Sequence, residues 1–399
     1  MTLPDAPWRN WPGMAELLAA LDAETGKVRF VGGAVRDTLL GLEVQDVDCA
    51  TVFRPEEAME RLEAAGIKTI PTGLKHGTVT AIIEKRPIEV TTLRRDVSTD
   101  GRHAEVAYSE NWEEDAARRD FTINALSTDP TTGEIFDYFG GQADLADRLV
   151  RFIGDPAERI AEDHLRILRF FRFHARFGSG APDAEGLAAT AKHANSLMAL
   201  SRERIADELI KMLTLPDPSE TIALMIEHGI FTPVLPEIVS ADALTRLITR
   251  EQAFDQSGDP IRRLAALLPP EPDTAMAVAT RLKMSRAQRK RLATATARIP
   301  GDTAEPRALA YRHGMDGAID RLLLCPTNDA VTGDAVALLT ENPPPERFPL
   351  KGGELIAMGM EAGPEVAVKL REIENIWVTE DFPDEARVRK IAQNLLSPE

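Results

Sequence analysis

The sequence predicts an α/β domain at the start of the chain, followed by a part that is entirely helical. Over about the first 145 residues, short apolar runs with strand character alternate with amphipathic helical patterns. Beyond about residue 146 the strand character fades and the helical periodicity continues. The length of 399 residues exceeds that of one ordinary domain, so we expect two or three.

Each expected element of the first domain has its own pattern. Short runs of apolar and β-branched residues indicate strands, and apolar positions that recur every three or four residues indicate helices. Two helical patterns end in glycine, at Gly41 and Gly66. In chain order we expect a strand at 27–31, a helix at 34–41, a strand at 46–52, a helix at 55–66, and a hairpin of strands at 77–83 and 86–93.

The helical part is divided by stretches rich in proline, which cannot continue a helix. One long loop is expected where three consecutive prolines precede a glycine pair. In chain order, helical patterns cover 156–178, 182–201 and 202–215, breaks are expected at 215–219 and 267–273, and the loop is expected at 342–355.

Cysteine content and the N-terminal segment indicate a cytoplasmic protein. Cys49 and Cys325 are the two cysteines, and so low a number argues against a disulfide framework or a cysteine metal site. The N-terminal segment has no basic stretch followed by a long apolar core, so we expect no secretory signal. No run approaches the ~18 apolar residues of a membrane span, so we expect no membrane partner.

The formal net charge of −17 argues against a general affinity for nucleic acid, because phosphate attracts basic surfaces. Two segments are nevertheless basic: residues 281–291 hold six basic side chains and residues 166–176 hold four arginines, and neither holds an acid. Such stripes can bind RNA locally, although each could also be a solvated helix face. Within the first stripe we expect Arg286, Arg289 and Lys290 to contact RNA phosphates.

Two aspartates of the second expected strand form the first candidate site. Residues two apart on a strand project to the same face, so Asp46 and Asp48 point together. Two carboxylates ~7 Å apart suit a divalent metal ion, which prefers hard oxygen ligands. Mg²⁺ retains several waters and takes further ligands from substrate phosphates, so few carboxylates suffice. An isolated Asp-x-Asp also occurs at surface turns, so the neighbouring sequence must decide between a metal site and a surface turn.

A glycine pair stands between the first expected strand and the first expected helix. Gly32 and Gly33 let the backbone approach a phosphate without a Cβ in the way, and the start of the helix adds unpaired N–H groups. Arg36, one turn into the helix, can add a guanidinium. The pattern matches neither the P-loop nor the dinucleotide-binding glycine motif. A phosphate cradle beside a carboxylate pair indicates a metal–nucleotide site.

A third carboxylate is expected from the strand at 86–93. Ile88 and Val90 share one face of this strand, whereas Glu89 and Thr91 share the other. Glu89 is therefore our candidate for the third catalytic carboxylate. The alternative is an ordinary exposed strand residue.

Several longer motifs occur together in a fixed order. They are VGGAVRDTLLG at 31–41, DVD at 46–48, GLKHGTVT at 73–80, RRDFTINAL at 118–126, GGQADLADRLVRFIGDP at 140–156 and EDHLRILRFFRF at 162–173. With them the chain resembles the class II tRNA nucleotidyltransferases, the CCA-adding enzymes, which share an ancestral head with bacterial poly(A) polymerases. The resemblance covers about residues 28–215, and residues 216–399 resemble the family only in general helical character.

The resemblance implies a polymerase-beta-like nucleotidyltransferase head, with a mixed sheet and flanking helices, followed by an all-α neck, body and tail. It implies a head at 1–145, a neck that reads the incoming nucleotide at 146–215, and a body and tail that bind tRNA at 216–399. The implied reaction is template-independent addition of CCA to the 3′ end of tRNA from CTP and ATP, with release of pyrophosphate. No obligate protein partner is evident.

The resemblance also implies roles for residues of the head. Asp46 and Asp48 would hold two Mg²⁺ ions. Gly33 and Arg36 match positions that touch the triphosphate, and Gly32 belongs to the same turn.

Arg119, in the RRDFTINAL motif, would lie at the triphosphate by the same resemblance. The residues alone allow another interpretation. Glu114 with Arg118, and Asp115 with Arg119, are spaced as i,i+4 pairs that could simply stabilise a helix.

The helix expected at 156–178 carries the residues that read the base in the family. Asp163 and Arg166 stand three apart and are therefore neighbours on one face of this helix. Arg169 and Arg172 continue the ridge and would lie near the nucleotide phosphate or sugar by resemblance. An adjacent apolar stripe of Leu165, Leu168 and Phe171 is expected to be core.

Two related activities remain as alternatives. The first is a poly(A) polymerase, against which GLKHGTVT and the lack of a long basic C-terminal extension argue. The second is a CC-adding enzyme that needs a partner for the terminal A. Such enzymes have a shorter flexible loop after the strand at 86–93, whereas residues 95–108 here are near full length. Outside this chemistry, an RNA-binding module with an inactive head conflicts with the intact Asp46 and Asp48.

Overall fold

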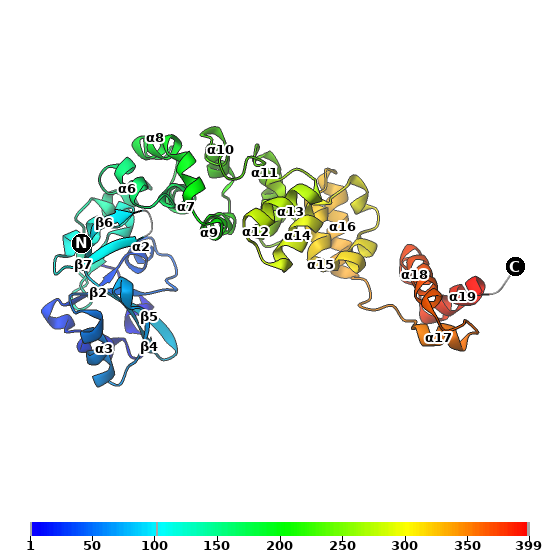
Figure 1. Ribbon diagram of the computed structural model, residues 1–399, viewed down its shortest axis with the longest axis horizontal. Helices are drawn as coiled ribbons and strands as arrows, with labels where there is room; N and C mark the ends of the chain where they lie inside the picture. Colours follow the sequence, from blue (N-terminus) through cyan, green and yellow to red (C-terminus); the bar gives the residue numbers. More distant parts are fainter. Residues whose placement is uncertain (1, 101–102, 397–399) are drawn as a thin grey trace. The chain divides into compact units, whose positions relative to one another are not determined.

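The computed structural model describes residues 2–100 and 103–396 (Figure 1). The chain divides into two compact units, Met1–Met212 with Glu227–Val234, and Leu213–Ile226 with Leu235–Glu399. The domain boundary expected after residue 215 lies close to this division. The boundary expected after residue 145 falls inside the first unit and stays a prediction.

A seven-stranded mixed sheet forms the α/β part of the first unit, as expected. Its strand order is β3-β4-β5-β2-β1-β8-β9, in which β2 and β5 are parallel and the other neighbours are antiparallel. A separate two-stranded sheet consists of β6 and β7. The strands are β1 Val28–Val31, β2 Asp48–Thr51, β3 Lys68–Gly73, β4 Thr78–Ile83, β5 Arg86–Thr92, β6 Arg94–Asp100, β7 His103–Tyr108, β8 Ser127–Thr128 and β9 Ile135–Phe136.

Nine α-helices accompany these strands in the described part of the chain up to residue 213. They are α1 Met14–Ala20, α2 Gly33–Leu39, α3 Pro55–Ala64, α4 Trp112–Ala117, α5 Gly141–Ala146, α6 Pro156–Glu162, α7 Arg166–Phe177, α8 Ala184–Lys192 and α9 Arg202–Leu213. The expected helices at 34–41 and 55–66 are confirmed as α2 and α3, and glycines follow both.

The rest of the described chain is helical, as predicted from its periodicity. Its helices are α10 Ser219–Glu227, α11 Asp242–Ala253, α12 Pro260–Leu267, α13 Pro272–Arg281, α14 Arg286–Thr296, α15 Pro306–Leu324, α16 Asp329–Glu341, α17 Gly352–Ala357, α18 Pro364–Thr379 and α19 Glu385–Leu396. The breaks expected at 215–219 and 267–273 separate α9 from α10 and α12 from α13. The loop expected at 342–355 is shorter, because α17 already begins at Gly352.

The helix expected over 156–178 is two helices, and the prediction of one continuous helix is wrong. Asp163 has φ −149° and ψ 106°, which ends α6. Its carboxylate Oδ1 then accepts a hydrogen bond from the backbone N–H of Leu165 at 3.0 Å. The aspartate thus satisfies a donor just before α7 begins, in the manner of a helix cap. Leu165, Leu168 and Phe171 are buried, as expected.

The strands differ from the prediction at the start of β2 and at five strands that were not expected, namely β3, β6, β7, β8 and β9. β2 begins at Asp48 rather than at residue 46. β3 was not expected because Pro71 and exposed positions interrupt its pattern, but it is an edge strand, where proline is tolerated. The segment 95–108 forms most of β6 and β7, and residues 101–102 of that prediction lie outside the described residues.

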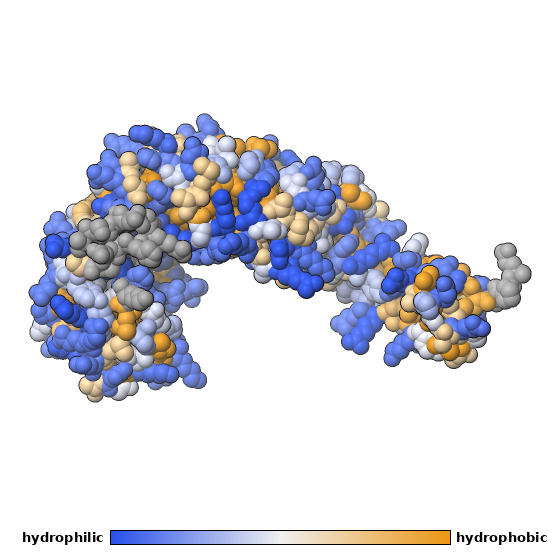
Figure 2. All heavy atoms as spheres, in the orientation of Figure 1, coloured by the Kyte–Doolittle hydropathy of each residue, from blue (hydrophilic) through white to orange (hydrophobic). Residues whose placement is uncertain are grey.

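The C-terminal helices α17 to α19 pack around Trp377, which is 2% exposed, and Ala308 and Tyr311 of α15 belong to the same core. Its indole Nε1 donates to the carbonyl of Pro383 at 2.8 Å. In the view of Figure 2, hydrophilic residues cover most of the visible surface and hydrophobic residues form scattered patches. In the described part of the chain, no helix combines the length and apolar character that a membrane crossing requires.

Candidate active site

A cavity of about 990 Å³ lies in the first unit and collects most of the residues predicted from sequence. Carboxylates reach it from β5, from β2 and from the loop before β2. Arginines reach it from the segment after α4 and from α7. The predicted residues that line it are Gly32, Gly33, Arg36, Asp46, Asp48, Glu89, Arg119, Asp163, Arg166 and Arg169.

The acidic part of the cavity is built on two parallel strands. Asp48 is the first residue of β2 and lies in register with Glu89 of β5. Asp46 precedes the strand, because β1 ends at Val31, the residue paired with Asp48, and offers no further partner. The alternation of side chains continues nonetheless: Val47 is 1% exposed, and Asp46 and Asp48 both line the cavity. Asp46, Asp48 and Glu89 thus line the same cavity.

Burial raises the pKa of Asp48 to about 6, together with the charges of Glu89 and Asp46 and against the opposing effect of Arg119. A carboxylate in this position gains from a nearby cation. Among the described residues, no group of three or more His, Cys, Asp or Glu side chains forms a complete metal site. The acidic residues could therefore supply part of a coordination shell, which is the way Mg²⁺ is usually held.

The glycine turn brings the backbone against an arginine. Gly32 has φ 67° and ψ −122°, and a Cβ there would lie 2.8 Å from Nη1 of Arg119. Arg119 donates to the carbonyl of Asn124 at 3.3 Å and forms an ion pair with Asp115 at 3.5 Å. Burial lowers the pKa of Arg119, and the charges of Asp115 and Asp48 oppose this effect. A half-buried guanidinium beside a glycine turn can meet an anion that enters the cavity.

Only one of the two expected i,i+4 pairs is formed among the described residues. Asp115 pairs with Arg119, as expected, but Arg118 also pairs with Asp115, at 2.8 Å. Glu114 instead accepts a hydrogen bond from Ser109 Oγ at 2.6 Å.

Arg36 is held firmly at the edge of the cavity. It is 6% exposed, pairs with Asp37 at 2.7 Å and donates to Asn124 Oδ1 at 2.5 Å. Its guanidinium also lies 4.1 Å from the centre of the Phe177 ring. Burial lowers the pKa of Arg36, although Asp37 counteracts this effect.

Asp120 joins α7 to the α/β part. It is 7% exposed and accepts hydrogen bonds from Arg169 Nε at 2.8 Å and from Asn124 Nδ2 at 2.9 Å. Burial alone would raise the pKa of Asp120, but the charge and hydrogen bonds of Arg169, together with Asn124, hold it below its usual range. This pair positions Arg169 at the cavity.

Asp163 and Arg166 both line the cavity, but each has its own partner. Asp163 Oδ2 accepts from Arg204 of α9 at 2.7 Å. Arg166 forms an ion pair with Glu162 and donates through Nη2 to the carbonyl of Arg118 at 3.0 Å. The prediction that the two residues neighbour each other on one helix is wrong, because Asp163 ends α6 and Arg166 begins α7.

Arg172 is the predicted nucleotide-binding residue that does not line the cavity. It pairs with the buried Glu208 of α9 at 2.5 Å. The basic stripe at 166–176 is thus not a solvated face. Its four arginines pair with Glu162, Asp120, Glu208 and Asp37.

Sequence reasoning missed several residues of the cavity. Asp120 and Asn124 belong to the RRDFTINAL motif. Because this motif continues beyond Arg119, it could have pointed to both residues. Arg176 and Lys211 also line the cavity. They come from α7 and α9, and only the folded chain shows that they reach it. Arg286, Arg289 and Lys290 lie in the second unit, around another cavity.

Comparisons with known proteins agree with this geometry. A family model for the poly A polymerase head domain matches residues 28–151. A model described as the probable RNA and SrmB-binding site of polymerase A matches residues 182–242. The mixed sheet, the paired carboxylates and the arginines of the cavity therefore define a nucleotidyltransferase.

The relatives specify which kind. The chain is 36% identical over 383 residues to the mitochondrial CCA tRNA nucleotidyltransferase 1 of Mus musculus, with 92% of this chain and 86% of that protein covered. It is 33% identical over 382 residues to the CCA-adding enzyme of Streptococcus gordonii, with 92% and 93% covered. The crystal structure of the Bacillus stearothermophilus CCA-adding enzyme in complex with CTP matches with a TM-score of 0.75 and 26% identity, covering 96% of this chain and 98% of that one. The chain belongs to the family of CCA-adding tRNA nucleotidyltransferases.

Proposed function

We propose that this enzyme adds CCA to the 3′ end of tRNA without a template, using CTP and ATP and releasing pyrophosphate. Family membership supports the reaction class, and the relative solved with CTP supports the substrate. The observation that carries the proposal is the cavity, where carboxylates of adjacent parallel strands meet arginines of the neighbouring helices.

The acidic residues fit two Mg²⁺ ions, with Asp46 and Asp48 as ligands and Glu89 as the third catalytic carboxylate. The donor set consists of hard oxygens. The raised pKa of Asp48 reflects its burial and the negative charge of Glu89 and Asp46, and a cation would neutralise that charge. Bound Mg²⁺ would activate the terminal 3′-hydroxyl and stabilise charge on the phosphates. The ligands it lacks would come from water and substrate.

The glycine turn and two arginines would hold the triphosphate. Gly32 and Gly33 let the backbone come close to a phosphate, and the guanidinium of Arg119 lies directly against Gly32. Arg36 is fixed by Asp37 and Asn124, so little side-chain entropy remains to be lost on binding. These residues orient the α-phosphate toward the carboxylates.

Asp163 and Arg166 would read the base. C and A each present an amino donor beside a ring-nitrogen acceptor, whereas U and G present the reverse. Asp163 is an acceptor with lone pairs beyond those given to Leu165 and Arg204. Arg166 Nη2 uses one hydrogen for the carbonyl of Arg118 and has a second. The pair thus retains an acceptor on Asp163 and a donor on Arg166. C and A would bond with both, whereas U and G would leave both unpaired.

Arg169 and Arg172 extend this part of the proposal. Arg169 lines the cavity and could contact the sugar or a phosphate of the nucleotide. Arg172 would act indirectly, by fixing the position of α7, since Glu208 holds its guanidinium.

The cytoplasmic location is also part of the proposal. Cell fractionation tests it, because the relatives include proteins named as mitochondrial.

A test of the reaction supplies one nucleoside triphosphate at a time. The enzyme is incubated with Mg²⁺ and tRNAs that end before, within and after CCA, and the products are sized. CTP alone should extend the shortest tRNA by two residues, and ATP alone should extend only a tRNA that ends in CC. A long tail from ATP would indicate a poly(A) polymerase. Failure to add the terminal A would indicate a CC-adding enzyme.

A further inference from the structure

A cavity separate from the active site lies in the second unit, between α11 and the ends of α14 and α15. Its volume is about 510 Å³. Its walls come from α11, from the loop between α12 and α13, from residues 298 and 300, and from residues 323–327. We name it the α11 cavity. A volume of this size is typical of sites that bind small organic molecules.

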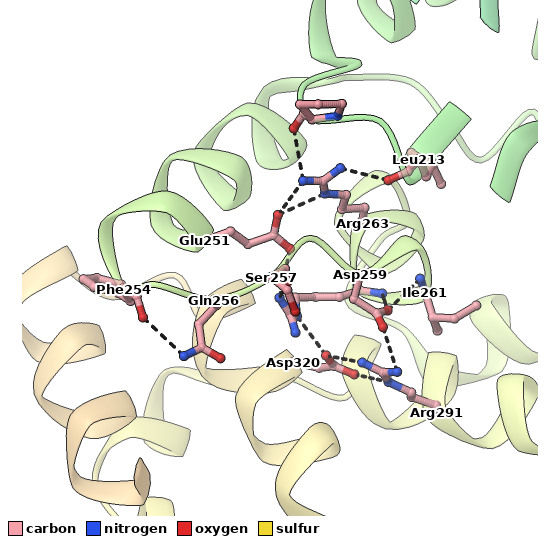
Figure 3. A network of polar contacts seen from close by, with 12 residues as sticks. Leu213, Glu251, Phe254, Gln256, Ser257, Asp259, Ile261, Arg263, Arg291 and Asp320 are labelled. Atoms are coloured by element: carbon pink, nitrogen blue, oxygen red, sulfur yellow. Dashed lines mark hydrogen bonds and ion pairs between the residues drawn. The ribbon is translucent and has the colours of Figure 1, made fainter. Parts of the chain in front are cut away.

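The buried arginines of the second unit pair with carboxylates, as far as the structure describes the chain. Figure 3 shows one such pair, Arg263 with Glu251, at 2.9 Å. The others are Arg250 with Asp329, Arg262 with Glu251 and Asp320, and Arg321 with Asp302. A guanidinium that is removed from water is thus compensated by an opposite charge.

Arg298, which lines the α11 cavity, has no carboxylate partner among the described residues. It is half-buried and donates to the backbone carbonyls of Ala265 and Leu268, each at 3.1 Å. These bonds use two of its five N–H groups, so three remain for a ligand. Burial lowers the pKa of Arg298, and no carboxylate counteracts this effect. An anion in the cavity would therefore stabilise this side chain.

A second cation of the cavity is exposed to solvent. Arg246 of α11 lines the cavity and forms no ion pair with any described carboxylate. Arg250, one helical turn further on, differs because four of its five N–H groups are used. They bond Asp329 and the carbonyls of Leu323, Cys325 and Thr327.

Arg246 and Arg298 are thus the two arginines of the cavity that can bind a ligand. None of the described residues that line the cavity is acidic.

The remaining walls of the cavity are largely apolar. They are formed by Leu247, Leu323, Leu324, Pro270, Pro300 and Pro326. A proline has no backbone N–H, so the proline rings present mainly CH₂ groups to a ligand. The thiol of Cys325 is occupied, because it donates to the carbonyl of Ile299 at 3.1 Å. Two cations beside apolar walls suit a ligand that has one anionic group and an apolar body.

We infer that the α11 cavity binds a small amphipathic anion, which has one phosphate or carboxylate group and an aromatic or aliphatic body. Arg246 and Arg298 would hold the anionic group by charge-assisted hydrogen bonds. The leucines and prolines would cover the body and remove it from water. A small molecule is favoured over RNA because Arg298 is half-buried and the surface around it is apolar. The inference is independent of the proposed function, since the two cavities share no residue.

The test uses isothermal titration calorimetry on the full chain in a buffer without phosphate. The probes are phenyl phosphate and benzoate, which have an anionic group and an apolar body, and inorganic phosphate and benzyl alcohol, which each have only one of these parts. Phenyl phosphate or benzoate should bind at least about tenfold more tightly than either partial probe. Tighter binding of phenyl phosphate would assign a phosphate ester as the ligand class, and tighter binding of benzoate a carboxylic acid.

Two variants assign the binding to the α11 cavity. Arg246→Gln removes one cation and should raise the Kd of the tighter probe by about tenfold. Its control is Arg371→Gln, at an exposed arginine of α18 outside the cavity. Ala243→Phe fills the cavity from the second residue of α11 and should also raise the Kd about tenfold or more. Its control is Ala287→Phe, at the exposed second residue of α14. Both controls should keep the wild-type Kd.

Three results would overturn the inference. The first is binding of phenyl phosphate and benzoate no tighter than that of the partial probes. The second is an equal Kd in either variant and its control, because the probe would then bind elsewhere. The third is displacement of the probe by tRNA that lacks CCA, because the cavity would then belong to an RNA-binding surface. Thermal melting checks the fold of each variant, and an unfolded Ala243→Phe is replaced by Ala243→Leu.

Discussion

At the scale of single residues, the active-site cavity joins groups that destabilise one another in the free protein. Asp48 is partly buried beside Glu89 and Asp46, so its ionised form is disfavoured and its pKa is raised to about 6. Arg119 is half-buried against the Gly32 turn, where a Cβ on residue 32 would lie 2.8 Å from its guanidinium. Each group would be stabilised by the substrate or ion that we propose. The predictions for these residues therefore concern both the catalytic activity and the thermal stability of variants.

Asp48→Asn should reduce kcat/KM for CTP by at least about 10³-fold, because a lost metal ligand removes several kcal/mol of transition-state stabilisation. Without Mg²⁺, the variant should melt no lower than the wild type, since Asn removes the repulsion with Glu89 and Asp46. Saturating Mg²⁺ should raise the Tm of the wild type but not that of the variant. Near-normal incorporation of C by the variant would refute the assignment of Asp48.

Gly32→Ala should impair both folding and nucleotide binding. The positive φ costs about 1–3 kcal/mol for a residue with a side chain, and the new Cβ would displace Arg119. Gly41→Ala is the matched control, because Gly41 also has φ 67° but has open space around its Cβ position. Both variants should lose Tm, and only Gly32→Ala should raise the KM for CTP and ATP. Equal KM values in the two variants would show that the turn does not serve the triphosphate.

Asp163→Ala should reduce discrimination between C or A and U or G. Recognition of a base edge by two hydrogen bonds contributes about 1–3 kcal/mol, so the ratio of kcat/KM for CTP to that for UTP should fall by about 5- to 150-fold. Arg204→Ala is a useful comparison, because it removes the partner of Asp163 and leaves the carboxylate in place. An unchanged ratio in Asp163→Ala would mean that this residue does not read the base.

At the scale of secondary structure, sequence patterns predicted the elements better than their ends. β1, α2, α3 and the β4–β5 hairpin follow from periodicity and glycine positions. The break between α6 and α7 was missed because apolar periodicity continues through it. An aspartate inside a helical pattern was the available signal, since Asp163 caps the segment before α7. β3 was missed because an edge strand tolerates proline and polar residues.

One of the contacts between α7 and the α/β part is the ion pair of Arg169 with Asp120. Asp120→Asn should lower the free energy of unfolding by about 2 kcal/mol, which is less than for a fully buried pair because Arg169 is 31% exposed. Asp155→Asn is the control, because Asn caps a helix about as well as Asp and α6 should be unaffected. Urea denaturation measures both. Equal stabilities of the two variants would contradict the proposed role of Asp120.

At the scale of the whole molecule, the sequence predicted which residues line the cavity better than which side chains contact each other. The strand alternation at Glu89 and the Asp-x-Asp led to the acidic part of the cavity. The partners of Arg172, Arg176 and Asp163 did not follow, because Glu208 and Arg204 of α9 and Asp37 of α2 are distant from them in sequence. The basic segment at 281–291 could not be divided into structural and available cations until Asp320 and Glu237 were located.

The central claim is that this chain itself specifies the sequence CCA, without a template. The most direct measurement supplies the wild-type enzyme with Mg²⁺, all four nucleoside triphosphates and a tRNA that lacks its last three residues, and then sequences the 3′ ends. Ends that read CCA, with no further extension and with U and G absent, are the predicted result. Homopolymeric A tails, ends that stop at CC, or frequent U and G would contradict the account.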